Sequence, residues 1–172
     1  MYLGQARKDV HTKIPGGRAG TVKTLELMRQ LAHKGSRDVT VREAAVRILR
    51  NAGVRGHDFR GERDALFRFV SDSIRFVRDP YGAELLQTPR YTLEHGFGDC
   101  DDKSTLLAAL LRAVGHPGPI RFRAVGETPR AFSHVYVVAR DGDRDLALDA
   151  TRAGTPLGWQ LPHPALAMDA PA

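Results

Sequence analysis

The sequence predicts an α+β domain in which N-terminal helices and one further helix pack on a small antiparallel sheet. Apolar residues recur at helical spacing through 21–73 and again from about 100 to 114. Two alternating runs, 133–140 and 143–150, flank Asp141-Gly142, which is typical of a hairpin turn between two strands. These patterns together define the fold class.

Length and composition limit the kind of protein this is. The 172 residues suit one domain with an appendage, and 42% hydrophobic content supports a globular fold. No apolar run reaches membrane-spanning length, and the N-terminus lacks the apolar stretch of a signal peptide. The single cysteine, Cys100, excludes an internal disulfide and suits a reducing compartment. We therefore expect a cytoplasmic protein with no membrane partner.

The chain is basic, with a net charge of +6 and a pI of about 9.9, and most of the positive charge comes from arginine. A basic chain can bind an acidic partner or nucleic acid, or simply carry a solvated arginine-rich surface. No basic run is interleaved with aromatic residues, which argues against nucleic-acid binding.

The N-terminal part predicts an arm followed by three helices. Residues 1–20 are polar, basic and glycine-rich, with no core face. A helix is expected over 21–33, a second from the capping-box pair Thr40 and Glu43, and a third from about Gly61 to Ser73.

The second part predicts a short extended piece at 74–77, a loop over 81–97, the apolar helix and a strand at 120–126 before the hairpin. Trp159 is expected to anchor a Pro/Ala-rich tail on the body. The expected organisation is an arm at 1–20, a domain at 21–152 with a helical part 21–73 and a catalytic core 74–152, and a tail at 153–172.

Cys100 stands where the apolar helix is expected to begin, in Gly98-Asp99-Cys100-Asp101-Asp102. Unpaired N–H groups and the helix dipole at such a position stabilise a thiolate. Asp99 could be the N-cap. Asp101 and Asp102 would raise the thiol pKa unless they cap the helix and point to solvent. We expect Cys100 to be a nucleophile with a lowered pKa.

His134 and Asp149 lie on the two runs of the predicted hairpin. If Asp141-Gly142 is the loop, His134 faces Asp149 directly and on the same side of the sheet. The same register pairs Val135 with Leu148, which builds an apolar face, whereas a longer loop would make the His–Asp contact diagonal. Such a carboxylate would orient the histidine for a Cys-His-Asp site.

No metal-ligand spacing is present among the other histidines. Asp141-Gly142-Asp143-Arg144-Asp145 imitates the start of a calcium loop but lacks the later glycine and the closing glutamate. We expect neither a metal nor another cofactor.

Over roughly 65–152 the chain resembles the transglutaminase-like superfamily, and it looks closest to a compact branch found in bacteria and prophages. The residues that carry the resemblance are Cys100 in its Gly98–Asp102 context, His134 in Ser133-His134-Val135, Asp149 in Leu148-Asp149-Ala150-Thr151, Asp79-Pro80 and Gln87-Thr88-Pro89. The resemblance implies a papain-like fold and acyl-transfer chemistry on amides. It does not imply protein crosslinking.

The implied roles are a Cys100 nucleophile, a His134 base and an Asp149 that fixes the imidazole tautomer, acting on a protein or peptide substrate. The oxyanion would be held by the Cys100 N–H and a second donor. In the family a Trp, Gln or Tyr upstream of the cysteine often has this role. Trp159 lies downstream, so Gln87 and Tyr81 are the candidates. Hydrolysis by a peptidase or amidase and transamidation both remain open.

A second hypothesis belongs to another class. The chain could be a structural or assembly component of a phage particle, with the 1–20 arm and the 153–172 tail docking on partner proteins. It would then be virion-associated.

Overall fold

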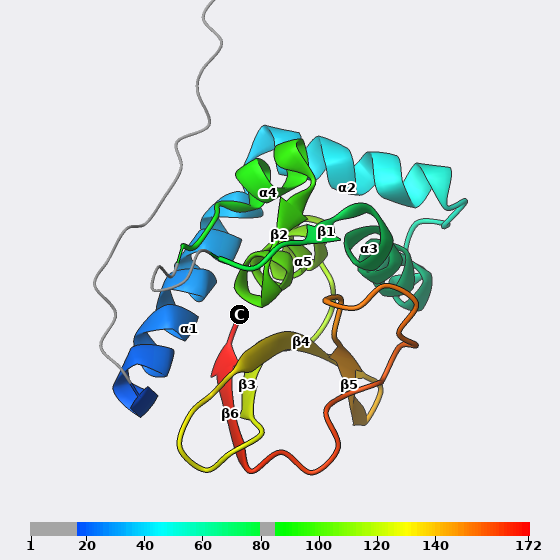
Figure 1. Ribbon diagram of the computed structural model, residues 1–172. Helices are drawn as coiled ribbons and strands as arrows, with labels where there is room; N and C mark the ends of the chain where they lie inside the picture. The colour runs from blue at the N-terminus through cyan, green and yellow to red at the C-terminus, as the bar shows by residue number, and fades with distance from the viewer. Residues whose placement is uncertain (1–16, 80–84) are drawn as a thin grey trace, which may run out of the picture.

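A computed structural model describes residues 17–79 and 85–172 of the protein (Figure 1). The arm expected at 1–20 lies mostly outside these residues, and its last four residues begin the first helix. The helices are α1 (Gly17–Gly35), α2 (Val39–Asn51), α3 (Phe59–Ser73), α4 (Pro89–His95) and α5 (Cys100–Ala113). The strands are β1 (Arg75–Phe76), β2 (Phe97–Gly98), β3 (Ile120–Gly126), β4 (His134–Asp141), β5 (Arg144–Leu148) and β6 (Leu166–Pro171).

The main sheet has four antiparallel strands in the order β5-β4-β3-β6, and β1 and β2 form a separate parallel pair. Helix α5 lies between this sheet and the other helices, and it packs against each of α1 to α4 as well as β4 (Figure 1). The predicted α+β class is confirmed. None of the helices in the described part of the chain is long and apolar enough to cross a membrane.

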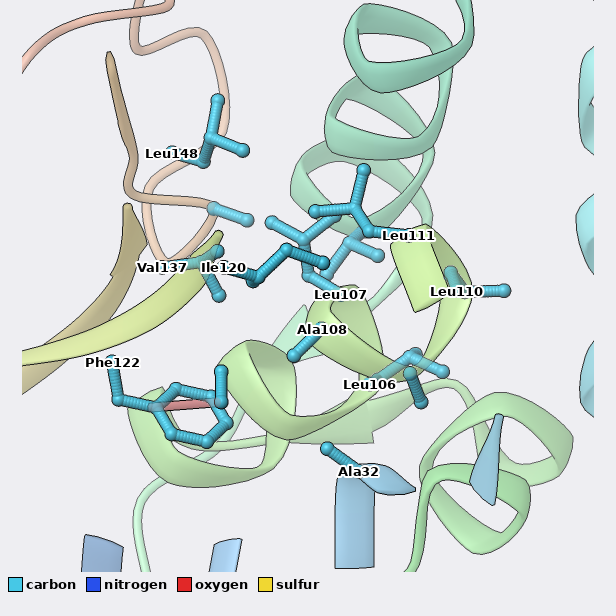
Figure 2. Close-up of a cluster of buried hydrophobic side chains, with 14 of the residues drawn as sticks. Ala32, Leu106, Leu107, Ala108, Leu110, Leu111, Ile120, Phe122, Val137 and Leu148 are labelled. Carbon is cyan, nitrogen blue, oxygen red and sulfur yellow. The ribbon is translucent and has the colours of Figure 1, made fainter. Parts of the chain in front are cut away.

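Helix α5 is the centre of the core. Its ten consecutive residues from Asp102 to Leu111 are all buried, so the helix is enclosed on every side instead of presenting the single apolar stripe we expected. Its leucines meet the sheet on one side and Ala32 of α1 on another (Figure 2). This enclosure gives Cys100, at the first position of the helix, a rigid support.

The N-terminal helices begin earlier than the sequence predicted. Helix α1 starts at Gly17 instead of residue 21, and α3 starts at Phe59, after the N-cap Asp58. The expected capping box from Thr40 is wrong, because Asp38 is the N-cap of α2. The Asp38 carboxylate accepts hydrogen bonds from the N–H groups of Thr40 at 2.8 Å and Val41 at 3.4 Å.

The segment expected to be a loop at 81–97 contains helix α4. Thr88 caps this helix by accepting the Tyr91 N–H at 3.2 Å, and Pro89 stands at the first helical position, where its missing N–H costs nothing. Gly96 ends the helix in the left-handed region at φ 70°. Strand β2 follows at once and leads through Asp99 to Cys100.

The tail expected at 153–172 contributes an edge strand to the sheet. Strand β6 pairs with β3, with Asp169 opposite Arg123. The Arg123 Nε and Asp169 Oδ1 atoms are 2.6 Å apart. The Ala- and Pro-rich composition concealed this strand, because such residues have little strand propensity.

Candidate active site

The loop before α5 closes into a capping box. Asp99 Oδ1 accepts hydrogen bonds from the N–H groups of Asp101 at 3.0 Å and Asp102 at 3.3 Å, and Asp102 Oδ2 accepts the Asp99 N–H at 3.3 Å. The expected N-cap role of Asp99 is confirmed. Upstream, the Val77 N–H donates to the Gly98 carbonyl at 3.0 Å, which ties β2 to the chain after β1. Cys100 is therefore held from both sides.

Two side chains of α5 hold one residue of β4. The Cys100 sulfur accepts a hydrogen bond from the Val135 N–H. One turn further along the helix, the Ser104 hydroxyl donates to the Val135 carbonyl at 3.2 Å. Because Val135 directly follows His134, these contacts set the histidine beside the cysteine.

His134 and Asp149 are hydrogen bonded, with 2.7 Å between Nε2 and Oδ2. The other carboxylate oxygen accepts from the N–H of Thr151 at 3.1 Å and from its hydroxyl. Burial alone would raise the pKa of Asp149, but the hydrogen bond and charge of His134, together with Thr151, hold that pKa below its usual value. An ionised Asp149 accepts the proton of Nε2, so Nδ1 is the histidine nitrogen that can take a proton.

The hairpin register differs from the predicted one by two residues. Asp141 pairs with Arg144 and Val137 with Leu148, so the two loop residues are Gly142 and Asp143. Gly142 has a φ of 60°, and a glycine at the first loop position is what a type II′ turn requires. A shift of two residues leaves every side chain on its predicted face. The contact between His134 and Asp149 is thus diagonal across the strands instead of direct.

The predicted lowering of the Cys100 pKa is wrong. Burial raises the pKa of the thiol above its usual value, and the carboxylates of Asp101 and Asp99 raise it further. The Val135 N–H opposes this and does not outweigh it. The thiol also lies 3.4 Å from Asp101 Oδ1, to which it donates. Anionic side chains at the start of the helix thus cancel the effect of the helix dipole, and Cys100 rests as a thiol.

Substitution of Asp101 by asparagine should lower the pKa of Cys100, because one of the anionic neighbours of the thiol is removed. Alkylation by iodoacetamide, followed against pH, should titrate above the free-thiol value of about 8.5 in the wild type and closer to that value in the variant. Asp143→Asn, in the exposed turn, is the matched control and should leave the titration unchanged. A wild-type titration at or below the free-thiol value would contradict this assignment.

Asp102 points inward instead of to solvent. It is 1% exposed, and its Oδ1 accepts the Gln87 N–H at 2.7 Å. Burial raises the pKa of Asp102 to about 7, helped by the charge of Asp99. This carboxyl fastens the segment before α4 to the start of α5.

The Asp102 carboxyl should make folding depend on pH. Its pKa rises from 3.8 to about 7 in the native state, which therefore binds the proton more tightly than the unfolded chain does. Its contribution to stability should be present in full below about pH 4 and lost as the pH rises to about 7, at up to ~1.4 kcal/mol per pH unit. Urea unfolding at pH 5, 6, 7 and 8 should show this slope as a difference between the wild type and Asp102→Asn. Parallel curves would contradict it.

Of the two oxyanion candidates from the sequence, Gln87 alone is among the described residues. Tyr81 is not among the described residues. The Gln87 side-chain oxygen accepts the Thr92 hydroxyl at 3.1 Å, and Gln87 does not line the cleft. The role of both residues remains a prediction.

A cleft of about 650 Å³ opens beside Cys100, His134 and Asp149. Several of its lining residues could not be predicted from the sequence, because they come from separate segments that the fold brings together. Arg78 could have been noticed as the residue before Asp79-Pro80. The remaining lining residues in the described chain are Phe76, Arg78, Asp99, Glu127, Ser133, Thr151, Arg152, Trp159 and Leu161.

Two acidic residues of the β4–β5 hairpin, Asp141 and Asp145, are paired with arginines. Asp141 lies 2.9 Å from Arg60 and 3.3 Å from Arg63, and Asp145 pairs with Arg121 and lies 3.6 Å from Arg140. A calcium ion would have to displace these cations. Donor atoms of Asp99, Cys100 and Asp101 also lie within 4.8 Å of one another, and the Asp99 carboxylate there caps α5.

We expect no metal site, so the melting temperature of the protein should not change when metals are added or removed. A metal ion that bound only the native state would raise that temperature. The measurement compares the protein with chelator, with millimolar calcium and with micromolar zinc. A calcium-dependent rise that Asp143→Asn abolishes would point to the hairpin. A zinc-dependent rise that Cys100→Ala abolishes would point to the group around the cysteine.

A family model and two solved structures show what the chain is similar to. The family model of the transglutaminase-like superfamily matches residues 55–140, which include Cys100 and His134 and stop before Asp149. A proposed cysteine protease from Cytophaga hutchinsonii is similar at 19% identity and a TM-score of 0.48, over 65% of this chain and 38% of that one. A proposed protease from Parabacteroides distasonis is similar at 12% identity and a TM-score of 0.53, over 77% of this chain and 27% of that one.

The chain thus spans well under half the length of either solved structure, and the second similarity supports the fold. None of the curated proteins compared with the chain matches it. The comparisons reach the superfamily and do not extend to the compact bacterial and prophage branch. With the family match covering half of the 172 residues, this protein belongs to the transglutaminase-like superfamily.

Proposed function

We propose that the protein is a cysteine-dependent acyl-transfer enzyme that acts on amide or peptide bonds. The observation that carries this proposal is the 2.7 Å hydrogen bond between His134 and Asp149, placed beside Cys100 in an open cleft. A nucleophile, a base and a carboxylate that orients the base are the three parts that such chemistry needs.

The reaction begins when His134 Nδ1 takes the proton of Cys100 as the sulfur attacks the carbonyl carbon. The carbonyl electrons move to oxygen, and the Cys100 N–H, which has no partner inside the helix, is a donor for that oxyanion. His134 then gives its proton to the leaving nitrogen, the C–N bond breaks and a thioester remains. Water or a second amine attacks the thioester and restores the thiol.

The raised pKa of Cys100 decides how the first step occurs. Because the thiol is neutral at rest, proton transfer to His134 accompanies the attack and does not precede it as a stable ion pair. The Asp149 carboxylate stabilises the imidazolium that forms during this step.

The test uses fluorogenic peptide amides with and without an added primary amine such as cadaverine. We expect an acyl adduct on Cys100 in the mass spectrum of the wild type and none on Cys100→Ala. Release of the free acid indicates a hydrolase, and incorporation of the amine indicates a transglutaminase. Absence of both turnover and adduct across a broad peptide set would overturn the proposal.

The comparisons do not favour the alternative of a phage assembly component. The end of the tail forms strand β6, which pairs with β3 of the same chain.

A further inference from the structure

The carboxylates that line the cleft are mostly engaged within the protein. Asp149 holds His134, and Asp99 caps α5. Glu127, which directly follows β3, is exposed and has no hydrogen bond or ion pair among the described residues. Among the described residues that line the cleft, Glu127 is therefore the acidic side chain left open to charge–charge contact with a substrate.

Two arginines of the cleft, Arg78 and Arg152, are in the opposite situation. Other arginines of the sheet pair with carboxylates, as Arg123 does with Asp169 at 2.6 Å. Arg78 and Arg152 are exposed, and neither forms an ion pair with any described residue. Among the described residues that line the cleft, two arginines and one carboxylate are thus left without an ion pair.

The Arg152 side chain is also held in place. Its guanidinium carbon lies 5.4 Å from the centroid of the Trp159 ring. Its main chain is fixed as well, because the Arg152 carbonyl accepts the Thr155 hydroxyl at 2.7 Å and the Ser71 hydroxyl at 3.3 Å. A guanidinium positioned over a ring keeps its N–H edge available for the two oxygens of a carboxylate.

Apolar side chains stand next to these cations. Phe76 is 41% exposed although it is a large hydrophobic residue, and it lines the same cleft as Trp159 and Leu161. A neutral and fully polar substrate would form neither an ion pair with these arginines nor an apolar contact with these side chains.

We propose that the substrate is an acidic peptide segment, whose side-chain carboxylate binds Arg152 and Arg78 while a neighbouring apolar residue packs against Phe76 and Trp159. This inference rests on the proposed function, since it assigns the substrate of the same cleft. The carboxylate that binds is that of an acidic side chain. The test below distinguishes it from the free C-terminal carboxylate of a peptide.

Trp159 provides the measurement, because it is the only tryptophan of the chain and lies in the cleft. Its fluorescence is followed while Cys100→Ala protein is titrated with three peptides at low salt. These are acetyl-Ala-Glu-Leu-Ala-amide, acetyl-Ala-Gln-Leu-Ala-amide, and acetyl-Ala-Gln-Leu-Ala with a free carboxylate. Because this variant lacks the nucleophile, binding is measured without turnover.

We expect the Glu peptide to bind at least about tenfold more tightly than the amidated Gln peptide, with the difference shrinking as salt rises. Arg152→Gln and Arg78→Gln, each made in the Cys100→Ala protein, should each reduce this preference. Arg144→Gln is the matched control, because Arg144 is an exposed arginine of the hairpin that does not line the cleft.

Equal binding of the Glu and amidated Gln peptides would overturn the inference, and so would a preference that both cleft variants retain. Tighter binding of the free-carboxylate peptide than of the Glu peptide would also overturn it, in favour of C-terminal recognition. The two proposals fail separately. A wild type that binds the Glu peptide selectively but cleaves or transfers no amide contradicts the proposed function alone, whereas turnover of neutral peptides without preference contradicts this inference alone.

Discussion

Replacement of His134 by alanine is expected to lower kcat/KM for a peptide amide by about 10³- to 10⁴-fold, the upper part of the range for general acid–base catalysis. The reason is the environment of Cys100. A thiol whose pKa is raised by burial and by Asp101 supplies almost no thiolate at neutral pH. The reaction then depends on a base in contact range, and His134 is the histidine that lines the cleft.

The pH profile separates this role from a structural one. In His134→Ala the residual rate should keep rising toward alkaline pH, because solvent must then remove the thiol proton. His95→Ala is the matched control, since His95 is exposed on α4 and stacks on Tyr91 outside the cleft. A loss below about tenfold, or a profile of unchanged shape, would remove His134 from the mechanism.

Replacement of Asp149 by asparagine is expected to lower kcat by about 10²- to 10⁴-fold while leaving the fold intact, as loss of tautomer control does in related triads. The carboxylate accepts the Nε2 proton of His134 at 2.7 Å. An asparagine amide can instead donate to Nε2, which moves the imidazole proton to Nδ1 and blocks the nitrogen that must take the Cys100 proton.

Thr151→Val is the comparison for this variant. It removes the hydroxyl that donates to Asp149 but keeps the carboxylate, so only a modest loss of kcat is expected. Circular dichroism and urea unfolding check that both variants fold. If Asp149→Asn retains most of its activity, the proton on Nε2 is fixed by something other than this carboxylate.

The sequence predicted those features that depend on local periodicity. Spacing predicts the three N-terminal helices and the apolar helix that begins at Cys100. Spacing also predicts that His134 and Asp149 share a face of the sheet, because a two-residue change of register leaves each side chain on the same face. Strand β6 has weak local signals, and its place in the sheet is set by pairing with β3.

The chemistry of the site was harder to predict than its residues. The rise in the Cys100 pKa comes from burial, which depends on packing by the whole domain. Likewise, Phe76, Arg78 and Trp159 meet in the cleft only after distant segments have folded together. No spacing rule in the chain connects them.

Gly98, which precedes the N-cap of α5, shows that much of the motif around Cys100 has a structural role. A side chain on Gly98 would place its Cβ only 2.5 Å from that of Asp102, so the buried acid can fold back only against a glycine. Gly98, Asp99 and Asp102 thus set the shape of the loop, and Asp99 in addition raises the pKa of Cys100. Within the Gly98–Asp102 motif most residues hold the loop in shape, and Cys100 is the residue to which the proposed mechanism gives the bond-making step.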